Sequence, residues 1–523
     1  MKKIMAIAAL LAAIILFAHS ASDSCYGTPA VKLGDEVLLT RYHYLIEGKK
    51  IGLVTNQSGV TGRGESMVDI LAGDRSTRLA ALYAPEHGLD GTAKAGEYVE
   101  SYTHEKLGIP VFSLYGKTRM PTEDMLRGID LLLFDIQDIG ARSYTYMSTL
   151  NYCLVAAKKY GKPVIVLDRP NPLGGEIVEG PVLEDRYKTF VGVDNLPMAH
   201  GMTAGELALF FNRNIGADLR VIKMEGYNRS MTYQDTGLPW VQTSPNIPDL
   251  DSVFGYMATG LGEGTGIFQA DKFKWIGGKG IDSQKFAGLL NRSGLPGVTF
   301  IPEDRDGAGG VRLKITDYHT FNPARTGLYA LAYAHSLNNF DVPKSGREIV
   351  MFDKIMGTAG IGGQLEQGLS PEEIVDKYTP GLNRFKEERK KYLLYGYGPG
   401  RGPDGEILYN VVAGGNTLSF DSPPYIDSNN RLIVPVRAIT EALGAGVSWD
   451  PSARKATITG QGGTVVFTID SVWATVDGKQ KRMDTCPVIK NGRTMVPVRY
   501  ISEYLGYSVD WDPDTRTVSI KKP

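Results

Sequence analysis

Cysteine is scarce in this sequence of 523 residues. Only Cys25, Cys153 and Cys486 occur, and they lie far apart. An odd number of widely spaced cysteines provides neither a disulfide framework nor a cysteine metal cluster. Cys153 stands in a helical pattern, so we interpret it as a small core residue rather than a nucleophile.

An excess of charge of either sign is also missing. The formal net charge is −1, whereas a nucleic-acid-binding surface normally shows as a basic excess. We therefore expect no nucleic acid partner. Long apolar runs are equally rare: the run at 4–18 is too short to span a bilayer comfortably, and no later segment is long enough. We expect no membrane span.

Nucleotide and esterase motifs do not occur. The loop at 59–64 reads GVTGRG, which has the wrong glycine spacing for a dinucleotide fingerprint, and no complete Walker-type loop follows. The Gly-x-Ser-x-Gly elbow of many esterases is absent too. We therefore expect no cofactor and no metal, and an exported esterase remains an alternative without a motif.

Residues 1–22 have the pattern of a signal peptide. Lys2 and Lys3 precede the apolar run, and small residues around Ala21 provide a cleavage site. Asp23 shortly before Cys25 argues against a lipid anchor. We predict a secreted, extracellular protein, with association to the cell wall as the further option.

Short apolar runs alternate with amphipathic segments from residue 51 to residue 168. Buried strands are predicted at 51–55, 79–84, 111–114, 130–136 and 163–167, and helices at 66–72, 122–127 and 144–160. This alternation predicts an α/β fold with a doubly wound parallel sheet.

Polar residues follow each predicted strand. The stretch Leu82 to Gly88 is the clearest example, because an apolar run stops at Pro85 and then presents Glu86 and His87. The other exits carry Asn56-Gln57, Tyr115-Gly116-Lys117, Gln137-Asp138 with Arg142, and Asp168-Arg169-Pro170-Asn171. Ligands of open α/β sheets bind at the carboxyl ends of the strands, so these exits predict one site.

Seven motifs in order carry a family resemblance. They are GLVTNQ (52–57), PEHG (85–88), DIGAR (138–142), YTY (144–146), DRPNPLGG (168–175), HGMT (200–203) and SPNIP (244–248). From about residue 31 to residue 395 the chain resembles the NamZ-type exo-β-N-acetylmuramidases. The resemblance implies a Rossmann-like subdomain on a smaller α+β subdomain, with the site between them. It also implies release of N-acetylmuramic acid (MurNAc) from the non-reducing end of peptidoglycan fragments, which are MurNAc-GlcNAc saccharides.

One segment departs from the family pattern. Relatives usually carry Gly-Arg-Gly-Thr followed by Pro-Phe-Glu, whereas this chain reads GEGTGIFQ at 262–269, with Glu263 in place of the arginine. The departure motivates an alternative function, a non-catalytic cell-wall fragment-binding protein that retains the fold.

Glycoside hydrolysis requires a proton donor and a group that stabilises the oxocarbenium-like transition state. We predict Glu86 as general acid, because burial at a strand end favours the protonated form of a carboxylic acid. His87 would orient it or hold a sugar hydroxyl; the alternative is a structural hydrogen bond. Asp138 and Asp168 are candidates for the second carboxylate, and the 2-acetamido group of the sugar is the other option.

The lactyl carboxylate of MurNAc calls for a cation. Arg142 or Arg169 could supply it in bidentate geometry; alternatively, Arg142 pairs with Asp135 or Asp138. The full set of predicted substrate-binding residues is Asn56, Arg142, Tyr144, Arg169, Asn171, His200 and Asn246.

The last part of the chain contains an internal repeat. VPVR at 434–437 and WDP at 449–451 both recur 62 residues later. This part resembles the copper amine oxidase N-terminal-like domain, but no histidine follows His335, so copper is not expected. Trp449 and Trp511 are predicted to be core residues; stacking on sugar rings is the alternative.

The predicted organisation has five parts. They are a signal peptide (1–22), a Rossmann-like catalytic subdomain (23–218), a second catalytic subdomain (219–395), a glycine–proline linker (396–415) and an α+β repeat module (416–523). We expect the module to bind a cell wall polymer.

Overall fold

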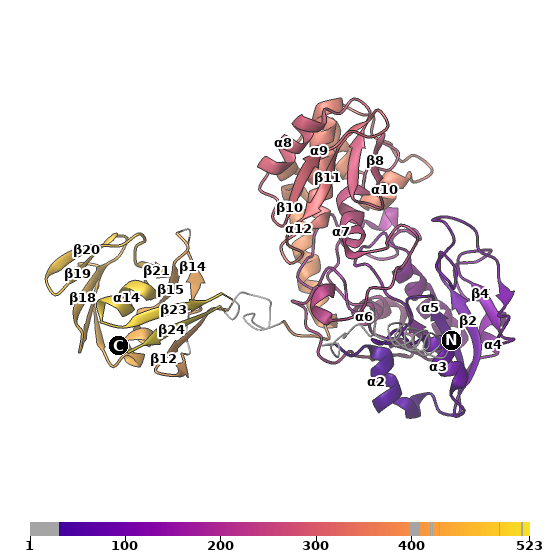
Figure 1. Cartoon of the computed structure of the whole chain (residues 1–523), viewed down its shortest axis with the longest axis horizontal. Coiled ribbons are helices and arrows are strands. Elements are labelled where there is room, and N and C mark those ends of the chain that lie inside the picture. Colours follow the sequence, from indigo (N-terminus) through magenta and orange to yellow (C-terminus); the bar gives the residue numbers. More distant parts are fainter. Residues whose placement is uncertain are drawn as a thin grey trace, which may run out of the picture. The chain divides into compact units, whose positions relative to one another are not determined.

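A computed structural model describes residues 31–397 and 408–522, apart from 419, 421, 428, 491, 514 and 515. The predicted signal peptide, Cys25 and much of the predicted linker lie outside the described residues. The chain divides into two compact units, Met1–Tyr395 and Gly396–Pro523 (Figure 1). Each unit is described by itself.

A seven-stranded sheet forms the first half of the larger unit. Its order is β3-β4-β2-β1-β5-β6-β7, and all neighbours are parallel except β3 and β4. The strands are β1 (Lys50–Thr55), β2 (Arg78–Ala84), β3 (Tyr102–Thr103), β4 (Pro110–Ser113), β5 (Leu131–Asp135), β6 (Val164–Leu167) and β7 (Leu219–Ile222). The five strands predicted up to residue 168 are confirmed, with ends that agree to within one residue.

Helices cover both faces of this sheet. Leu131 and Leu133 of β5 pack in the core beneath α2 (Gly34–Arg41) and α3 (Met67–Gly73). Leu132 and Phe134 belong to the opposite core, with α4 (Glu123–Arg127), α5 (Tyr146–Tyr160) and α6 (Ala204–Ile215). Successive side chains of a strand point to opposite faces, so an unbroken apolar run is what a strand covered on both sides requires.

The second half of the larger unit has a separate antiparallel sheet of order β10-β11-β9-β8. Figure 1 shows it with α8 and α9 in a lobe away from the large sheet. The strands are β8 (Ile267–Ala270), β9 (Trp275–Gly278), β10 (Val298–Pro302) and β11 (Gly309–Ile315). The helices are α7 (Leu250–Thr259), α8 (Ser283–Arg292), α9 (Pro323–Asn338), α10 (Met351–Met356), α11 (Gly360–Glu366) and α12 (Pro371–Arg389). Short 3-10 helices lie at His43–Leu45, Asp185–Tyr187, Tyr233–Thr236 and Lys390–Tyr392.

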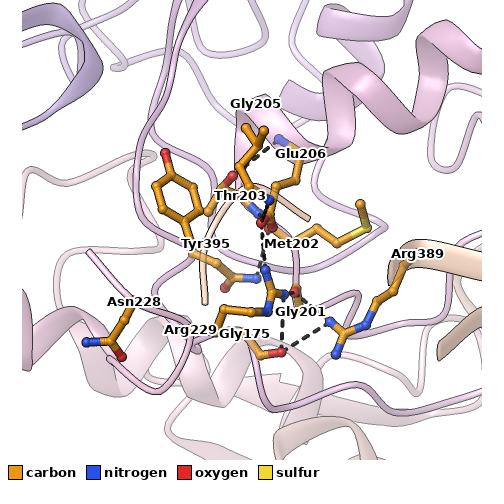
Figure 2. A network of polar contacts seen from close by, with 12 residues as sticks. Gly175, Gly201, Met202, Thr203, Gly205, Glu206, Asn228, Arg229, Arg389 and Tyr395 are labelled. Carbon is orange, nitrogen blue, oxygen red and sulfur yellow. Dashed lines mark hydrogen bonds and ion pairs between the residues drawn. The ribbon is translucent and has the colours of Figure 1, made fainter. Parts of the chain in front are cut away.

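The end of the larger unit is fastened to the loop before α6 (Figure 2). The buried Arg229 donates from Nη1 to Glu206 Oε1 at 2.6 Å, and the Leu394 amide donates to the same oxygen at 2.8 Å. Arg389 Nη1 donates to the Gly201 carbonyl at 2.7 Å. The buried side chain of Arg389 therefore anchors the end of α12 inside the larger unit.

The C-terminal unit contains three sheets and two short helices. Its sheets have the orders β13-β12-β24-β23, β14-β15-β22-β21 and β16-β17-β18-β19-β20. The helices are α13 (Val436–Ala442) and α14 (Val498–Tyr504). The strands are β12 (Asn410–Ala413), β13 (Asn416–Thr417), β14 (Tyr425–Ile426), β15 (Leu432–Pro435), β16 (Gly446–Asp450), β17 (Lys455–Gly460), β18 (Gly463–Thr468), β19 (Trp473–Val476), β20 (Lys479–Arg482), β21 (Val488–Lys490), β22 (Arg493–Pro497), β23 (Ser508–Asp512) and β24 (Thr517–Lys521).

The two strands that carry the repeated VPVR sequence pair with each other. Val434 of β15 pairs with Val496 of β22, its own repeat partner, in an antiparallel ladder. Helices α13 and α14, and likewise strands β16 and β23, begin and end at positions 62 residues apart.

The prediction that Trp449 and Trp511 belong to the core is wrong. Their side chains are 41% and 43% exposed. The reason is that β16 and β23 are edge strands of their sheets, so a residue on either has a neighbouring strand on one side only.

Within the residues that the structure describes, no helix combines the length and apolar character needed to cross a membrane.

Candidate active site

A cavity of about 460 Å³ lies in the larger unit, where strand exits of the large sheet meet residues of the second half. Glu86 and His87, which follow β2, and Tyr115, which follows β4, line it from the sheet side. Its other lining residues are Ala95, Gly96, Ser143, Tyr144, Thr145, Val191, Ser244, Asn246, Ile247, Tyr256, Gly260, Leu261, Glu263, Gln269, Phe273, Met351 and Ile355. Glu86, His87, Tyr144 and Asn246 are the predicted site residues that the structure brings together here.

Glu86 is held by two hydrogen-bond donors. The Thr145 hydroxyl donates to Oε2 at 2.5 Å, and the Gly96 amide donates to Oε1 at 2.8 Å. The residue is only 8% exposed. Burial raises the pKa of the neighbouring Tyr115 phenol, and the Glu86 charge adds to that rise. The two donors thus hold the Glu86 carboxyl group in one orientation at the cavity.

His87 sits in an unusual backbone conformation. Its φ is 71°, and the φ of Gly88 is 81°. A left-handed backbone at a non-glycine residue costs about 1–3 kcal/mol and recurs at functional sites. The ring donates from Nδ1 to the Ala93 carbonyl at 2.7 Å, which leaves Nε2 of the neutral ring as a hydrogen-bond acceptor. The predicted structural hydrogen bond and a free acceptor at the cavity thus coexist.

Tyr144 and Tyr256 line the cavity, and Tyr146 packs against Tyr144 outside the lining. The ring of Tyr144 lies edge-on to Tyr146 at 4.8 Å and to Tyr256 at 5.7 Å between centroids. The Tyr144 hydroxyl donates to Thr243 Oγ1 at 3.0 Å, which fixes it against the segment before α7. Burial raises the pKa of Tyr256 to about 12, so its hydroxyl remains a donor at neutral pH.

Sequence reasoning missed Thr145 as the partner of Glu86, and it missed Tyr256 altogether. The Tyr144-Thr145-Tyr146 motif was the available signal for Thr145. Its contact with Glu86 joins positions 59 residues apart, and no local pattern specifies such a pair.

Glu263 also lines the cavity, with an exposed side chain. The segment that departs from the family pattern therefore places a second carboxylate in the same cavity as Glu86. Lysine and arginine do not occur among the described residues that line this cavity. The cavity is acidic and aromatic.

Asp138 and His200 lie behind the lining. Asp138 Oδ2 accepts from the Gly140 amide at 2.9 Å and is 3.4 Å from His200 Nε2. The Met202 amide donates to His200 Nδ1 at 3.2 Å, so the neutral ring carries its proton on Nε2, facing Asp138. Burial raises the pKa of Tyr256 and the charge of Asp138 adds to that rise, but Asp138 does not line the cavity.

The two predicted arginines are engaged elsewhere. Arg169 donates from Nε to Asp135 Oδ1 at 2.6 Å and from Nη2 to Asp35 Oδ2 at 2.9 Å. Arg142 donates to the backbone carbonyls of Pro181, Leu196 and Ile355 at 2.6–2.9 Å. Burial lowers the pKa of Arg142 to about 9. Neither side chain lines the cavity, and the alternative salt bridge of Arg142 to Asp135 or Asp138 does not occur in the described chain.

Asp168 is enclosed by donors. The Gly205 amide donates to Oδ1 at 2.7 Å, and the hydroxyls of Thr203 and Tyr395 donate to Oδ2 at 2.9 and 2.6 Å. Burial raises the pKa of Asp168 to about 7. These contacts fasten β6 to the N-terminus of α6, and Asp168 lies outside the cavity lining.

Asn171 and Asn56 also shape loops outside the lining. Asn171 Nδ2 donates to the Met202 carbonyl at 3.1 Å. Asn56 Oδ1 accepts from the Ser58 hydroxyl at 2.6 Å, and its buried Nδ2 has no partner among the described residues. The substrate-binding roles assigned to both residues from the sequence stay predictions.

Metal-ligating side chains do not gather in the described part of the chain: no group of three or more His, Cys, Asp and Glu residues could hold an ion.

Comparisons with known proteins agree with this architecture. Residues 51–251 match the N-terminal domain of the exo-β-N-acetylmuramidase NamZ, residues 254–395 its C-terminal domain, and residues 412–520 the copper amine oxidase N-terminal domain. The peptidoglycan β-N-acetylmuramidase NamZ of Bacillus subtilis is 45% identical over 384 residues, which are 70% of this chain and 92% of that protein.

Solved structures are similar as well. The crystal structure of a DUF1343 family protein from Bacteroides fragilis matches with a TM-score of 0.64 and 36% identity, over 71% of this chain and all of that one. A second such protein from the same organism matches with a TM-score of 0.53 and 28% identity, over 70% and 99% of the two chains. The chain belongs to the NamZ family of exo-β-N-acetylmuramidases.

Proposed function

We propose that this protein is an exo-acting glycoside hydrolase that releases N-acetylmuramic acid from the non-reducing end of peptidoglycan fragments. Family membership and 45% identity to a peptidoglycan β-N-acetylmuramidase support the reaction. The observation that carries the proposal is the buried Glu86 carboxyl group, which two donors orient at the cavity.

In the proposed reaction, Glu86 gives its proton to the oxygen of the glycosidic bond as the bond from that oxygen to the anomeric carbon breaks. Water then supplies the hydroxyl of the released sugar and returns a proton to Glu86. His87 Nε2 accepts a hydrogen bond from a sugar hydroxyl. The positive charge that develops at the anomeric carbon is stabilised by the 2-acetamido group of the substrate or by the second carboxylate of the cavity, Glu263.

Recognition of the lactyl group follows from the same geometry. Arg142 and Arg169 are bound to carbonyls and carboxylates and do not line the cavity, so neutral donors remain for this role. We assign it to Asn246, whose exposed side chain lines the cavity, and to the Tyr256 hydroxyl.

The test uses a β-linked aryl glycoside of N-acetylmuramic acid and compares the mature protein with Glu86→Gln. Loss of general acid catalysis should lower kcat about 10²–10⁴-fold. Glu97→Gln is the matched control, because it removes the same charge from an exposed position in the same loop, outside the lining.

Other outcomes would revise the proposal. Activity that survives in Glu86→Gln would move the proton donor to another carboxylate. A wild-type protein that binds muramic acid fragments without cleaving them would favour the alternative, a non-catalytic binder.

We further propose that the large sheet is Rossmann-like, that the C-terminal unit is a duplicated module, and that the protein is exported and held on the cell wall. The order β4-β2-β1-β5-β6-β7 with helices on both faces supports a Rossmann-like, doubly wound sheet. Elements that recur 62 residues apart support a duplicated C-terminal module. The N-terminal sequence pattern supports export, and the C-terminal unit would then hold the enzyme on the cell wall.

A further inference from the structure

A groove of about 320 Å³ opens on the C-terminal unit. Trp449 and Ile489 line it with 41% and 48% of their surfaces exposed, and Arg437 and Arg493 lie beside them. Acidic side chains do not occur among the described residues that line it. The groove therefore combines an accessible aromatic face with cationic groups.

The indole is presented by the edge of a sheet. Trp449 lies on β16, opposite Ala456 of β17 in the antiparallel ladder. Alanine is too small to cover an indole ring, and β16 has no strand on its other side. Contiguous exposed apolar patches with a polar rim mark interaction sites, and Trp449 and Ile489 line one groove together with two arginines.

The charge of the groove differs from that of its repeat counterpart. At the positions equivalent to the groove residues, Arg499 Nε is 3.5 Å from Glu503 Oε1, and Arg431 forms an ion pair with Asp484. Arg437 corresponds to Arg499, but its guanidinium has no ion pair or hydrogen bond in the described parts of the chain. The groove beside Trp449 thus keeps Arg437 as a cation that is available to an external anion.

We propose that this groove binds the glycan strand of peptidoglycan, with a pyranose ring against Trp449 and a carboxylate on Arg437. The apolar C–H face of a pyranose packs on an indole, and a guanidinium binds a carboxylate in bidentate geometry. Peptidoglycan is the ligand we choose because the larger unit belongs to a peptidoglycan-cleaving family. The inference names the site of the proposed wall association and does not require the glycosidase activity.

The experiment measures co-sedimentation of the full-length mature protein with purified peptidoglycan from which attached anionic polymers have been removed. Trp449→Ala and Arg437→Gln should each weaken binding about tenfold, a loss typical of one stacking or charged contact. Trp511→Ala and Arg499→Gln are the matched controls in the other copy, since Trp511 is equally exposed on the equivalent strand. They should bind like the wild type.

Three results would overturn the inference: unchanged binding of both first-copy variants, equal loss in the matched controls, or binding only to walls that retain their anionic polymers. Cleavage of the aryl glycoside should be the same in all four variants, because none of these residues belongs to the larger unit. Failure of binding and failure of the proposed reaction are therefore separate results.

Discussion

Arg169 provides the sharpest test of how the structure assigns roles near the site. Its guanidinium lies between the fully buried carboxylates of Asp135 and Asp35, at 2.6 and 2.9 Å. Arg169→Met leaves both carboxylates without a cation in the interior. Breaking a buried ion pair in this way costs about 3–5 kcal/mol of folding free energy. We therefore expect a large loss of stability, and not a selective loss of muramic acid recognition.

The loss should depend on pH. Burial already raises the pKa of Asp35 from 3.8 to about 8, against the lowering effect of Arg169, and burial raises the pKa of Asp135 too. When a group has a higher pKa in the folded state than in the unfolded state, the folded state binds more protons at pH values between the two pKa values. The free energy of unfolding therefore falls as pH rises through that range. Removal of Arg169 raises the pKa values of Asp35 and Asp135 in the folded state further. The stability of the Arg169→Met variant should be closest to that of the wild type at pH 5 and lowest at pH 9.

The assay is urea unfolding of the full-length protein at pH 5 and pH 9, together with kcat/KM on muramic acid and glucosamine aryl glycosides. Asp35→Asn/Asp135→Asn/Arg169→Met is the control, because it removes all three charges and should recover part of the stability. The reasoning would be refuted if the Arg169→Met protein unfolded like the wild type but no longer preferred the muramic acid substrate. Arg169 would then be assigned to substrate binding.

Three further predictions concern neighbouring groups. Thr145→Val, which removes the hydroxyl donor of Glu86, should lower kcat about tenfold with little change in KM, and Thr145→Ser should restore it; equal kcat in both variants would contradict this. Asp168→Asn should flatten the pH dependence of unfolding between pH 4 and pH 7. The reason is that Asp168 has a pKa of about 7 in the folded state, so its ionisation costs the wild type up to about 4 kcal/mol of stability as pH rises. Thermal melts whose midpoints change with pH as in the wild type would count against it. Arg229→Met should destabilise the larger unit by about 3–5 kcal/mol, because Glu206 would stay buried without its cation; urea unfolding at neutral pH measures the loss, and a wild-type midpoint would show that the pair contributes little.

The strands and the position of the acid could be predicted because both are local properties. The run 131–134 is apolar on both faces, and the structure buries both faces of β5. Pro85 ends β2 and places Glu86 and His87 at the cavity. The predictions agree with the structure at the strands and at Glu86, where the residues of one short segment determine the local structure.

The partners of the polar residues could not be predicted. Asp168 and Arg169 follow a strand just as Glu86 does, but they fasten neighbouring loops instead of lining the cavity. The contact between Arg169 and Asp35 joins positions 134 residues apart. Trp449 and Trp511 were predicted to be core residues because they occupy equivalent positions of the repeat. The sheet order instead puts both on edge strands. In each case the outcome depends on a distant element, which the local pattern does not contain.

The fastening at the end of the larger unit has a mechanical consequence. An enzyme tethered through its C-terminal unit is pulled at Tyr395, the last residue of the larger one. That load passes through the hydroxyl of Tyr395 to Asp168 and through Arg389 to the loop at Gly201. None of these residues lines the cavity. Tension on the tether is therefore carried into the framework of the fold, and the geometry around Glu86 is spared.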